Sequence, residues 1–315
     1  SDLGYRFDPQ GRIAIGKESF TFTVIGTNET EFDGCCDEYS MLTVNKTTGD
    51  YAISTIATKR YRPGSEQCGK YGCGIMSFSR LNDDKHMIVW MQPQISPAPP
   101  MPTRSIENNE GLSLGNFDVR TGEITPIRPF KINIDNTSLS TPMDSGMASY
   151  DSINQRFWFS CNPRGDIDHE GVCWYPATKS NEQSDVSVFE FTDKNYTINS
   201  IGFSEALNGV VIMAQTFNET DPLQAQNTKL FFANPSLGKK WSMLVDLGAA
   251  RNSLHKGTLS VCGRYFFAVL EVGIKDIKYP AQDLIMVDLL EKKVVKRVHA
   301  QHTQEEIAVL SAFEC

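Results

Sequence analysis

The feature that most constrains this chain is a hairpin that recurs along its length. In each copy, a run of alternating apolar residues leads into a polar turn and then into a second apolar run. Alternation of this kind, rich in β-branched and aromatic residues, is typical of β-strands. The six copies begin at Tyr5, Ser40, Leu112, Val172, Leu230 and Leu284. No segment has a convincing helical period, so the pattern predicts an all-β chain.

A second hairpin type lies between the later copies of the first. It starts with small or polar residues and ends in a very apolar strand. Its four copies begin at Ile75, Met147, Ser200 and Thr258. One hairpin of each type makes four antiparallel strands, and this unit returns after roughly 50 to 60 residues, a period that indicates a repeat architecture.

This four-stranded period resembles the blades of a β-propeller. Two turns of the first hairpin type read Thr-Gly-Asp and Thr-Gly-Glu, at residues 48–50 and 121–123, a phrase typical of outer hairpins in propellers. The resemblance is to the superfold alone, because the chain has none of the signature motifs of individual propeller families.

The resemblance implies one domain over residues 1–315, with about six four-stranded blades. The N-terminal hairpin and a C-terminal strand from Ile307 would close the ring by completing one blade together. Five or seven blades also fit, because residues 17–38 look irregular. A pair of β-sandwiches is the alternative architecture.

Charge and hydropathy restrict the partners. The formal net charge is −8, and no cluster of Lys and Arg forms a basic stripe, so we expect no nucleic-acid partner. No apolar run is long enough to span a bilayer, so we expect no membrane span within this chain.

The cysteines predict a disulfide framework. There are eight, an even number, and their spacing fits no zinc pattern. Cys161 and Cys173 bracket one loop and are expected to pair. Cys262 and Cys315 would lock the closing blade, where no peptide bond joins the strands. Cys35 and Cys36 would bond Cys68 and Cys73 in an order that the sequence leaves open.

Five N-x-Ser/Thr sequons accompany the cysteines. They lie at Asn28, Asn45, Asn136, Asn195 and Asn218. Together with the cysteines they favour a secreted or cell-surface glycoprotein over a cytosolic protein with scattered thiols. No signal peptide begins at Ser1, which fits a chain that has already been processed.

The loop CNPRGDIDHEGVC, residues 161–173, allows three interpretations. Arg164-Gly165-Asp166 between two cysteines resembles the adhesive loop of the disintegrin family, which implies integrin binding. Alternatively, Asp166, Asp168 and Glu170 could converge on Ca²⁺ if the loop curls. The third interpretation, a structural disulfide-stapled turn with solvating acids, is the one that we favour.

Aromatic residues next to polar loops are candidates for a ligand-binding face. Trp174 and Tyr175 follow the disulfide-bracketed loop, and Tyr279 stands in another loop. Packing of these aromatic residues between blades is the plainer interpretation. His299 and His302 are interpreted as surface histidines.

The sequence favours a binding protein over an enzyme. Familiar catalytic and nucleotide-binding motifs are absent. We expect an extracellular recognition, adhesion or structural module whose loops bind a protein or a glycan, with no required cofactor. The alternative is a secreted hydrolase of glycans or esters, with acidic residues or Ca²⁺ at a central channel. Propellers host both classes, so the fold cannot decide between them.

Overall fold

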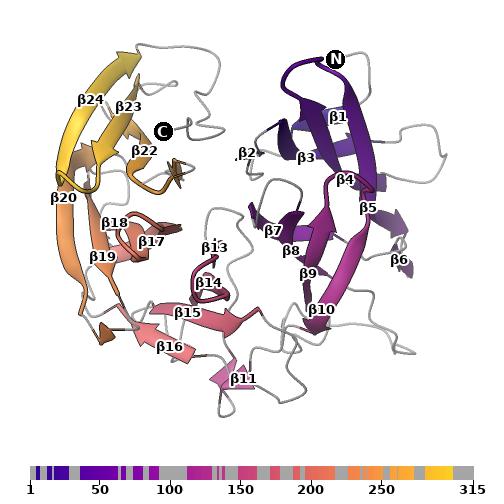
Figure 1. The fold of residues 1–315 in the computed structure, drawn as a ribbon, viewed down its shortest axis with the longest axis horizontal. Coiled ribbons are helices and arrows are strands. Elements are labelled where there is room, and N and C mark those ends of the chain that lie inside the picture. Colours follow the sequence, from indigo (N-terminus) through magenta and orange to yellow (C-terminus); the bar gives the residue numbers. More distant parts are fainter. Residues whose placement is uncertain are drawn as a thin grey trace. The chain divides into compact units, whose positions relative to one another are not determined.

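The fold comes from a computed structural model of the chain (Figure 1). The described residues are 5–7, 13–15, 18–27, 36–62, 65–68, 74–80, 85–91, 112–129, 133–134, 137–138, 148–161, 171–177, 187–191, 196–216, 226–234, 237–238, 240–250, 256–260, 262–272 and 281–300. They form antiparallel strands joined by turns, which confirms the predicted all-β class.

The chain divides into two compact units. One comprises residues 1–145 and 177–185, and the other comprises residues 146–176 and 186–315. The expected single domain stays a prediction.

The first unit contains two large sheets and a small one. The first sheet holds β1 (Tyr5–Phe7), β2 (Ile13–Ile15), β3 (Ser19–Thr27), β4 (Cys36–Asn45), β5 (Tyr51–Arg62) and β6 (Ser65–Cys68), in the order β1-β3-β4-β5-β6 with β2 also on β3. The second sheet holds β7 (Gly74–Arg80), β8 (Lys85–Met91), β9 (Leu112–Asp118) and β10 (Ile124–Pro129), in the order β10-β9-β8-β7. A small sheet pairs β11 (Asn133–Ile134) with β12 (Thr137–Ser138).

The second unit contains three four-stranded sheets, each following chain order. The first holds β13 (Ala148–Asp151), β14 (Arg156–Cys161), β15 (Gly171–Pro176) and β16 (Ser187–Glu190). The next holds β17 (Tyr196–Ser204), β18 (Gly209–Thr216), β19 (Gln226–Ala233) and β20 (Ser242–Ala250). The last holds β21 (Lys256–Leu259), β22 (Tyr265–Val272), β23 (Ala281–Asp288) and β24 (Lys293–Ala300).

These successive four-stranded antiparallel sheets are the blades of a β-propeller and confirm the predicted fold class. From Ile75 onward, each predicted pair of hairpins forms one sheet. Ring closure and a total of six blades stay predictions, since the C-terminal strand from Ile307 lies outside the described residues.

The N-terminal part differs from the prediction. The expected hairpin from Tyr5 does not form, because β1 and β2 both pair with β3 and not with each other. β3 itself occupies part of the segment expected to be irregular. Its text, SFTFTVIGT, alternates with period two, and the long strand offers β1 and β2 a common partner.

The core of the second unit lies on both faces of the sheet β17–β20. Neighbouring residues of β18 point in opposite directions, as the pleat requires. Val210 and Ile212 belong to a cluster shared with the sheet β13–β16, whereas Val211 and Met213 belong to one shared with β21–β24. The sheet β17–β20 therefore lies between the other two (Figure 1). This double burial explains why VVIMA is apolar without alternation.

Serine hydroxyls link the first strands of these three sheets. The Phe203 N–H donates to Ser149 Oγ across 3.0 Å, joining β17 to β13. Ser200 Oγ donates to the Gly257 carbonyl across 2.7 Å, joining β17 to β21. The small, polar start of the second hairpin type thus has a structural role, because small side chains allow close approach and hydroxyls satisfy backbone groups between the sheets.

In the described part of the chain, five four-residue hairpin turns share one hydrogen-bonding pattern. A side-chain oxygen of the first residue accepts backbone N–H groups two or three positions later, and the fifth residue has a positive φ. The pairs of first and fifth residues are Asn45 and Gly49, Asp118 and Gly122, Asp151 and Gln155, Ser204 and Asn208, and Asp288 and Lys292. Asn, Asp and Ser suit the first position because their side chains reach nearby backbone donors.

This pattern also explains the Thr-Gly-acid phrase. Thr48 Oγ1 accepts the Asp50 N–H at 3.2 Å, and Thr121 Oγ1 accepts the Glu123 N–H at 3.3 Å. The glycine that follows each threonine takes the left-handed conformation. The first phrase lies in the hairpin of β4 and β5, and the second in the hairpin of β9 and β10.

Candidate binding surface

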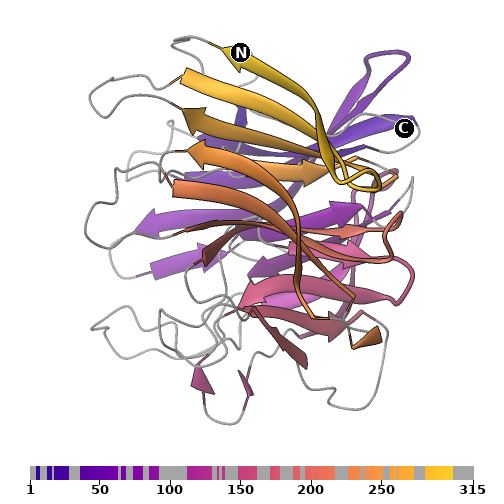
Figure 2. The same ribbon diagram turned by 90° about the vertical axis from the view of Figure 1, so that its left-hand side faces the viewer.

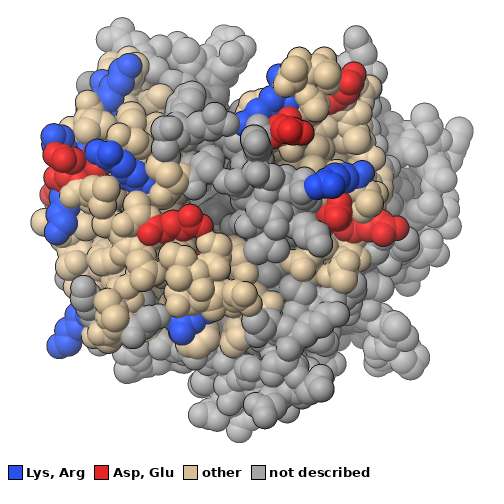
Figure 3. Space-filling view, in the orientation of Figure 1, with Lys and Arg blue, Asp and Glu red and all other residues tan. Residues whose placement is uncertain are grey.

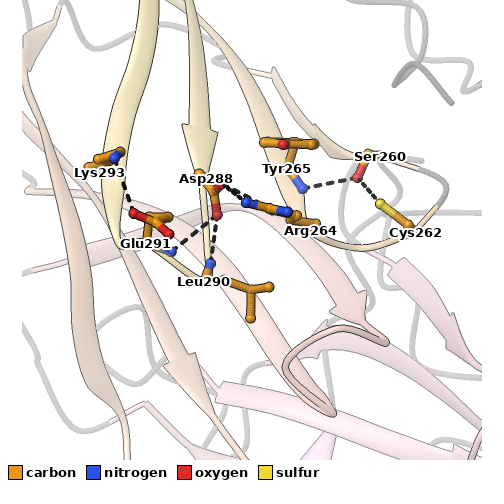
Figure 4. Close-up of polar contacts among 8 residues, drawn as sticks. All are labelled: Ser260, Cys262, Arg264, Tyr265, Asp288, Leu290, Glu291 and Lys293. Atoms are coloured by element: carbon orange, nitrogen blue, oxygen red, sulfur yellow. Dashed lines mark hydrogen bonds and ion pairs between the residues drawn. The ribbon is translucent and has the colours of Figure 1, made fainter. Parts of the chain in front are cut away.

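The candidate surface is built on the outer hairpin β23–β24 of the last sheet, whose turn is held by a buried carboxylate. Asp288 Oδ1 accepts the N–H groups of Leu290 and Glu291, at 3.0 and 3.1 Å. Asp288 Oδ2 accepts Nε and Nη2 of Arg264, at 3.0 and 2.6 Å (Figure 4). Arg264 comes from the turn before β22, so the ion pair ties two hairpins together.

The ion pair shifts the titration of both groups. The Arg264 guanidinium, by hydrogen bonding, holds the pKa of Asp288 below its usual value, and backbone N–H groups act in the same direction. The hydrogen bond to Asp288 likewise raises the pKa of Arg264. The Leu289 N–H donates to the Arg264 carbonyl at 2.9 Å, which fixes the same turn a second time.

The tip and the last strand of this hairpin face solvent. Leu290 at the tip is 50% exposed, and Val295 and Val298 on β24 are each 43% exposed. Within the described residues β24 pairs only with β23, so it is the edge of its sheet. Figure 2 shows the outer strands of the last two sheets, in orange and yellow, turned toward the viewer.

Basic side chains are concentrated on this exposed edge. Residues 292–299 read KKVVKRVH, so four of eight are Lys or Arg, compared with 30 in the 315-residue chain. Lys and Arg side chains gather along the flank where β24 lies, at the upper left of Figure 3. The expectation of no basic cluster was therefore wrong locally. Although the net charge of the whole chain is negative, β24 is locally basic, and in the fold this strand lies at the exposed edge of its sheet.

β24 contains a β-bulge. Met286 pairs with Lys296 and Val287 with Val294, which leaves Val295 as the extra residue. Beyond the bulge, Arg297 and His299 lie opposite Ile285 and Asp283, while Lys296 and Val298 lie opposite Met286 and Leu284.

The carboxylate of Asp283 neutralises the charge on the face of β24 that carries Arg297 and His299. Asp283, which is 5% exposed, accepts Arg297 Nη1 at 3.1 Å and contacts His299 Nδ1 at 2.7 Å. Arg297 Nη2 also donates to the Leu247 carbonyl of β20. This cluster fastens the edge strand to the neighbouring sheet, so Arg297 has a structural partner on each side.

Two lysines remain without such partners. Lys293 pairs with the exposed Glu291 at 3.1 Å, and Arg297 pairs with Asp283. Lys292 and Lys296 are exposed, and neither forms an ion pair with any residue in the described part of the chain. We define the β24 surface as the exposed side chains Leu290, Lys292, Val295, Lys296 and Val298. It combines unpaired positive charge with apolar groups that water solvates poorly.

Trp174, a predicted ligand-binding aromatic, is packed against its own sheet. Its ring centroid lies 6.1 Å from that of Trp158, and the Arg156 guanidinium lies 4.2 Å above its ring. Trp174 is half-buried beside the core shared by the sheets β13–β16 and β17–β20. Its ligand-binding role stays a prediction.

Most other predicted site residues lie outside the described part of the chain. This applies to Arg164, Gly165, Asp166, Asp168, Glu170 and Tyr279. Tyr175 lies in β15, where its side chain is not described. The adhesion and Ca²⁺ interpretations of the loop therefore stay predictions. Within the described residues, no three His, Cys, Asp or Glu side chains are placed to hold a metal ion.

The predicted disulfide pairs also stay predictions. Cys173 is fully buried, and Cys262 Sγ lies 3.4 Å from Ser260 Oγ. Cys36, Cys68 and Cys161 lie in described strands, but their side chains are not described. Cys35, Cys73 and Cys315 lie outside the described residues.

Of the five sequon asparagines, Asn45 is the one that falls within the described residues. The others, Asn28, Asn136, Asn195 and Asn218, do not. In the described part of the chain, no helix has the length and apolar character needed to cross a bilayer.

Comparison with known proteins shows no family for this chain. No family model matches the chain, and no curated protein matches it. An oligogalacturonate lyase from Vibrio parahaemolyticus is similar in structure, at 11% identity and a TM-score of 0.47, over 97% of this chain and 84% of the lyase. A Trypanosoma rangeli sialidase is similar at 11% identity and a TM-score of 0.49, over 90% of this chain and 47% of the sialidase chain.

TolB from Acinetobacter baumannii shares 10% identity at a TM-score of 0.45, over 96% of this chain and 65% of TolB. All three are β-propeller folds. Similarity at this level carries no information about the function of this chain.

Proposed function

We propose that this protein is an extracellular recognition module that binds an acidic protein partner through the β24 surface. The observation that carries the proposal is the exposure of Lys292 and Lys296 beside Val295 and Val298. On a chain with a net charge of −8, this strand is a local exception that attracts an oppositely charged partner.

The apolar residues favour a protein over a polyanionic glycan. Leu290, Val295 and Val298 gain free energy only when a partner removes them from water, and apolar side chains on a protein can do that. Sulfated or carboxylated sugars would engage the two lysines and leave the apolar groups exposed.

The contact is expected to use side chains rather than an added strand. Edge strands carrying lysines and a bulge resist pairing with another strand. β24 has both features, the bulge at Val295 and lysines along its length. The partner would therefore lie across the side chains of the hairpin.

The extracellular setting is part of the same proposal. Eight cysteines and five sequons support a secreted or surface-displayed, disulfide-bonded glycoprotein. The hydrolase alternative requires acids or Ca²⁺ at a central channel, and no described cluster favours it over binding.

The test is a selection of binders from a displayed library of random peptides. The intact protein should enrich peptides that combine Asp or Glu with apolar residues, and their binding should weaken as salt is added. Lys296→Glu should weaken the selected peptides about fivefold, which corresponds to about 1 kcal/mol of surface charge interaction.

Lys240→Glu makes the same charge change at another exposed lysine of the second unit and serves as the control. Peptides without acidic enrichment, or equal loss of binding in both variants, would overturn the proposal. Salt-sensitive binding of sulfated glycans that Lys296→Glu abolishes, without any peptide binding, would also overturn it in favour of a glycan ligand.

A further inference from the structure

We propose that Asn45 carries an N-linked glycan and that its turn is built to present one. Asn45-Lys46-Thr47 is a sequon, and it forms the beginning of the turn between β4 and β5. The proposal concerns the first unit and goes beyond the binding function assigned to β24. It rests on the extracellular setting and the glycoprotein character that are part of the proposed function, and it assigns one site to them.

The turn uses the oxygen of the Asn45 amide and leaves its nitrogen available. Oδ1 accepts the N–H groups of Thr47 and Thr48, at 2.8 and 3.0 Å. The backbone N–H of Asn45 donates to the Asp50 carbonyl at 2.8 Å, and its carbonyl accepts the Gly49 N–H at 3.0 Å. Within the described residues, no hydrogen bond engages the Asn45 Nδ2.

A second turn in the same unit shows that this geometry does not need an amide. Asp118 occupies the first position of the turn between β9 and β10 and accepts the Arg120 and Thr121 N–H groups, at 2.9 and 3.2 Å. Its backbone makes the same two hydrogen bonds, to Gly122 and Glu123. A carboxylate therefore does everything that the turn requires. Among the described residues the Asn45 amide nitrogen has no hydrogen-bond partner, and this nitrogen is the atom to which an N-linked glycan is attached.

The turn at Asn45 has more open space around it than the turn at Asp118. A Cβ placed on Gly49 would meet no atom within 4 Å, whereas one on Gly122 would lie 2.1 Å from Ser54 Oγ. Residues 47–51 are all exposed. The turn at Asn45 thus projects into open space, where a bulky and hydrated sugar is accommodated.

The chemistry is a glycosyl transfer from a lipid-pyrophosphate-linked oligosaccharide. The Asn45 Nδ2 forms a bond to C1 of the first sugar, and the bond from C1 to the pyrophosphate oxygen breaks. The lipid pyrophosphate leaves with the electron pair, and the amide nitrogen loses one proton to the transferase. Thr47 supplies the sequon hydroxyl and is exposed.

The test is peptide mapping of the full chain exported from eukaryotic cells. The protein is treated with a peptide N-glycosidase in ¹⁸O-labelled water, which converts each occupied asparagine to labelled aspartate. We expect label at position 45. Thr47→Ser should keep it and Thr47→Val should lose it. Asn45→Asp should remove one glycan and leave the thermal midpoint within a few degrees of the parent, because Asp118 supports the same turn.

An unlabelled Asn45 in folded, exported protein whose other sequons are labelled overturns this proposal alone. If all five asparagines are unlabelled in exported protein, the proposed glycoprotein character is overturned with it. Neither result bears on the peptide binding of the β24 surface, which Lys296→Glu tests in the second unit.

Discussion

Replacing Ser149 with alanine tests whether serine hydroxyls join the sheets of the second unit. Ser149 Oγ accepts the N–H of Phe203 from the next sheet at 3.0 Å, in a buried position. Alanine removes this acceptor and changes little else, because serine and alanine differ by one oxygen. The Phe203 N–H is then left buried without a partner.

The expected change in the free energy of unfolding follows from the loss of this hydrogen-bond acceptor. An unsatisfied buried donor costs about 1–3 kcal/mol, whereas a typical intramolecular hydrogen bond contributes about 0.5–1.5 kcal/mol net. Ser149→Ala should therefore lower the free energy of unfolding by about 1–3 kcal/mol. Ser200→Ala removes the donor to the Gly257 carbonyl, which is only partly buried and can bind water instead. It should therefore lower the free energy of unfolding by less, about 0.5–1.5 kcal/mol.

Urea unfolding followed by tryptophan fluorescence measures the difference, since Trp158, Trp174 and Trp241 all lie in this unit. Ser242→Ala is the control, because this exposed serine of β20 makes only a long hydrogen bond, 3.4 Å to the Phe232 carbonyl, within its own sheet; it should stay within about 0.5 kcal/mol of the parent. If Ser149→Ala were no more destabilising than this control, or less destabilising than Ser200→Ala, the hydroxyls would not be the link between sheets that we describe.

Three further predictions concern single positions. Lys292 has a φ of 52°, so Lys292→Gly should relieve left-handed strain and raise the free energy of unfolding in urea by up to about 1 kcal/mol; a lower free energy of unfolding contradicts this. The pKa of Asp288 is lowered on folding by Arg264, so its contribution is complete at neutral pH and fades as the pH falls through that lowered pKa. Asp288→Asn should therefore flatten stability against pH in the acid range, and an unchanged profile would refute the assignment. Gly202→Ala would bring a Cβ to 2.4 Å from Leu259 Cδ1 and should cost about 1–3 kcal/mol in thermal or urea unfolding, unless the leucine rotates away.

Much of the fold was predictable because strand pairing here is local. Each hairpin joins neighbouring runs of sequence, so alternation and turn residues were enough to place β7 to β10 and β13 to β24 in four-stranded units. The two-stranded sheet of β11 and β12 was not predicted. The N-terminal sheet was harder to predict. The text of β3 alternates clearly, but β1 and β2 pair with it across intervening residues, and no local signal specifies which strand a short run of three residues will join.

The candidate surface was only partly predictable. The basic text KKVVKRVH is visible in the sequence, but its charges look alike there. Asp283 and Glu291 neutralise Arg297 and Lys293 and leave Lys292 and Lys296 to solvent, a division set by cross-strand register and by the bulge at Val295. Trp174 was proposed as a ligand-binding residue because it follows a polar loop. Its contacts with Trp158 and Arg156 could not be predicted, because they depend on how the sheet folds.

The sequence by itself determined the all-β class, the four-stranded unit and the turns, because side-chain alternation and backbone capping act over a few residues. Tertiary structure decided which faces are buried, which charges are neutralised and which strand is left as an exposed edge. Those outcomes depend on residues far apart in the chain meeting in register, as Ser149 meets Phe203 and as Arg297 meets Leu247.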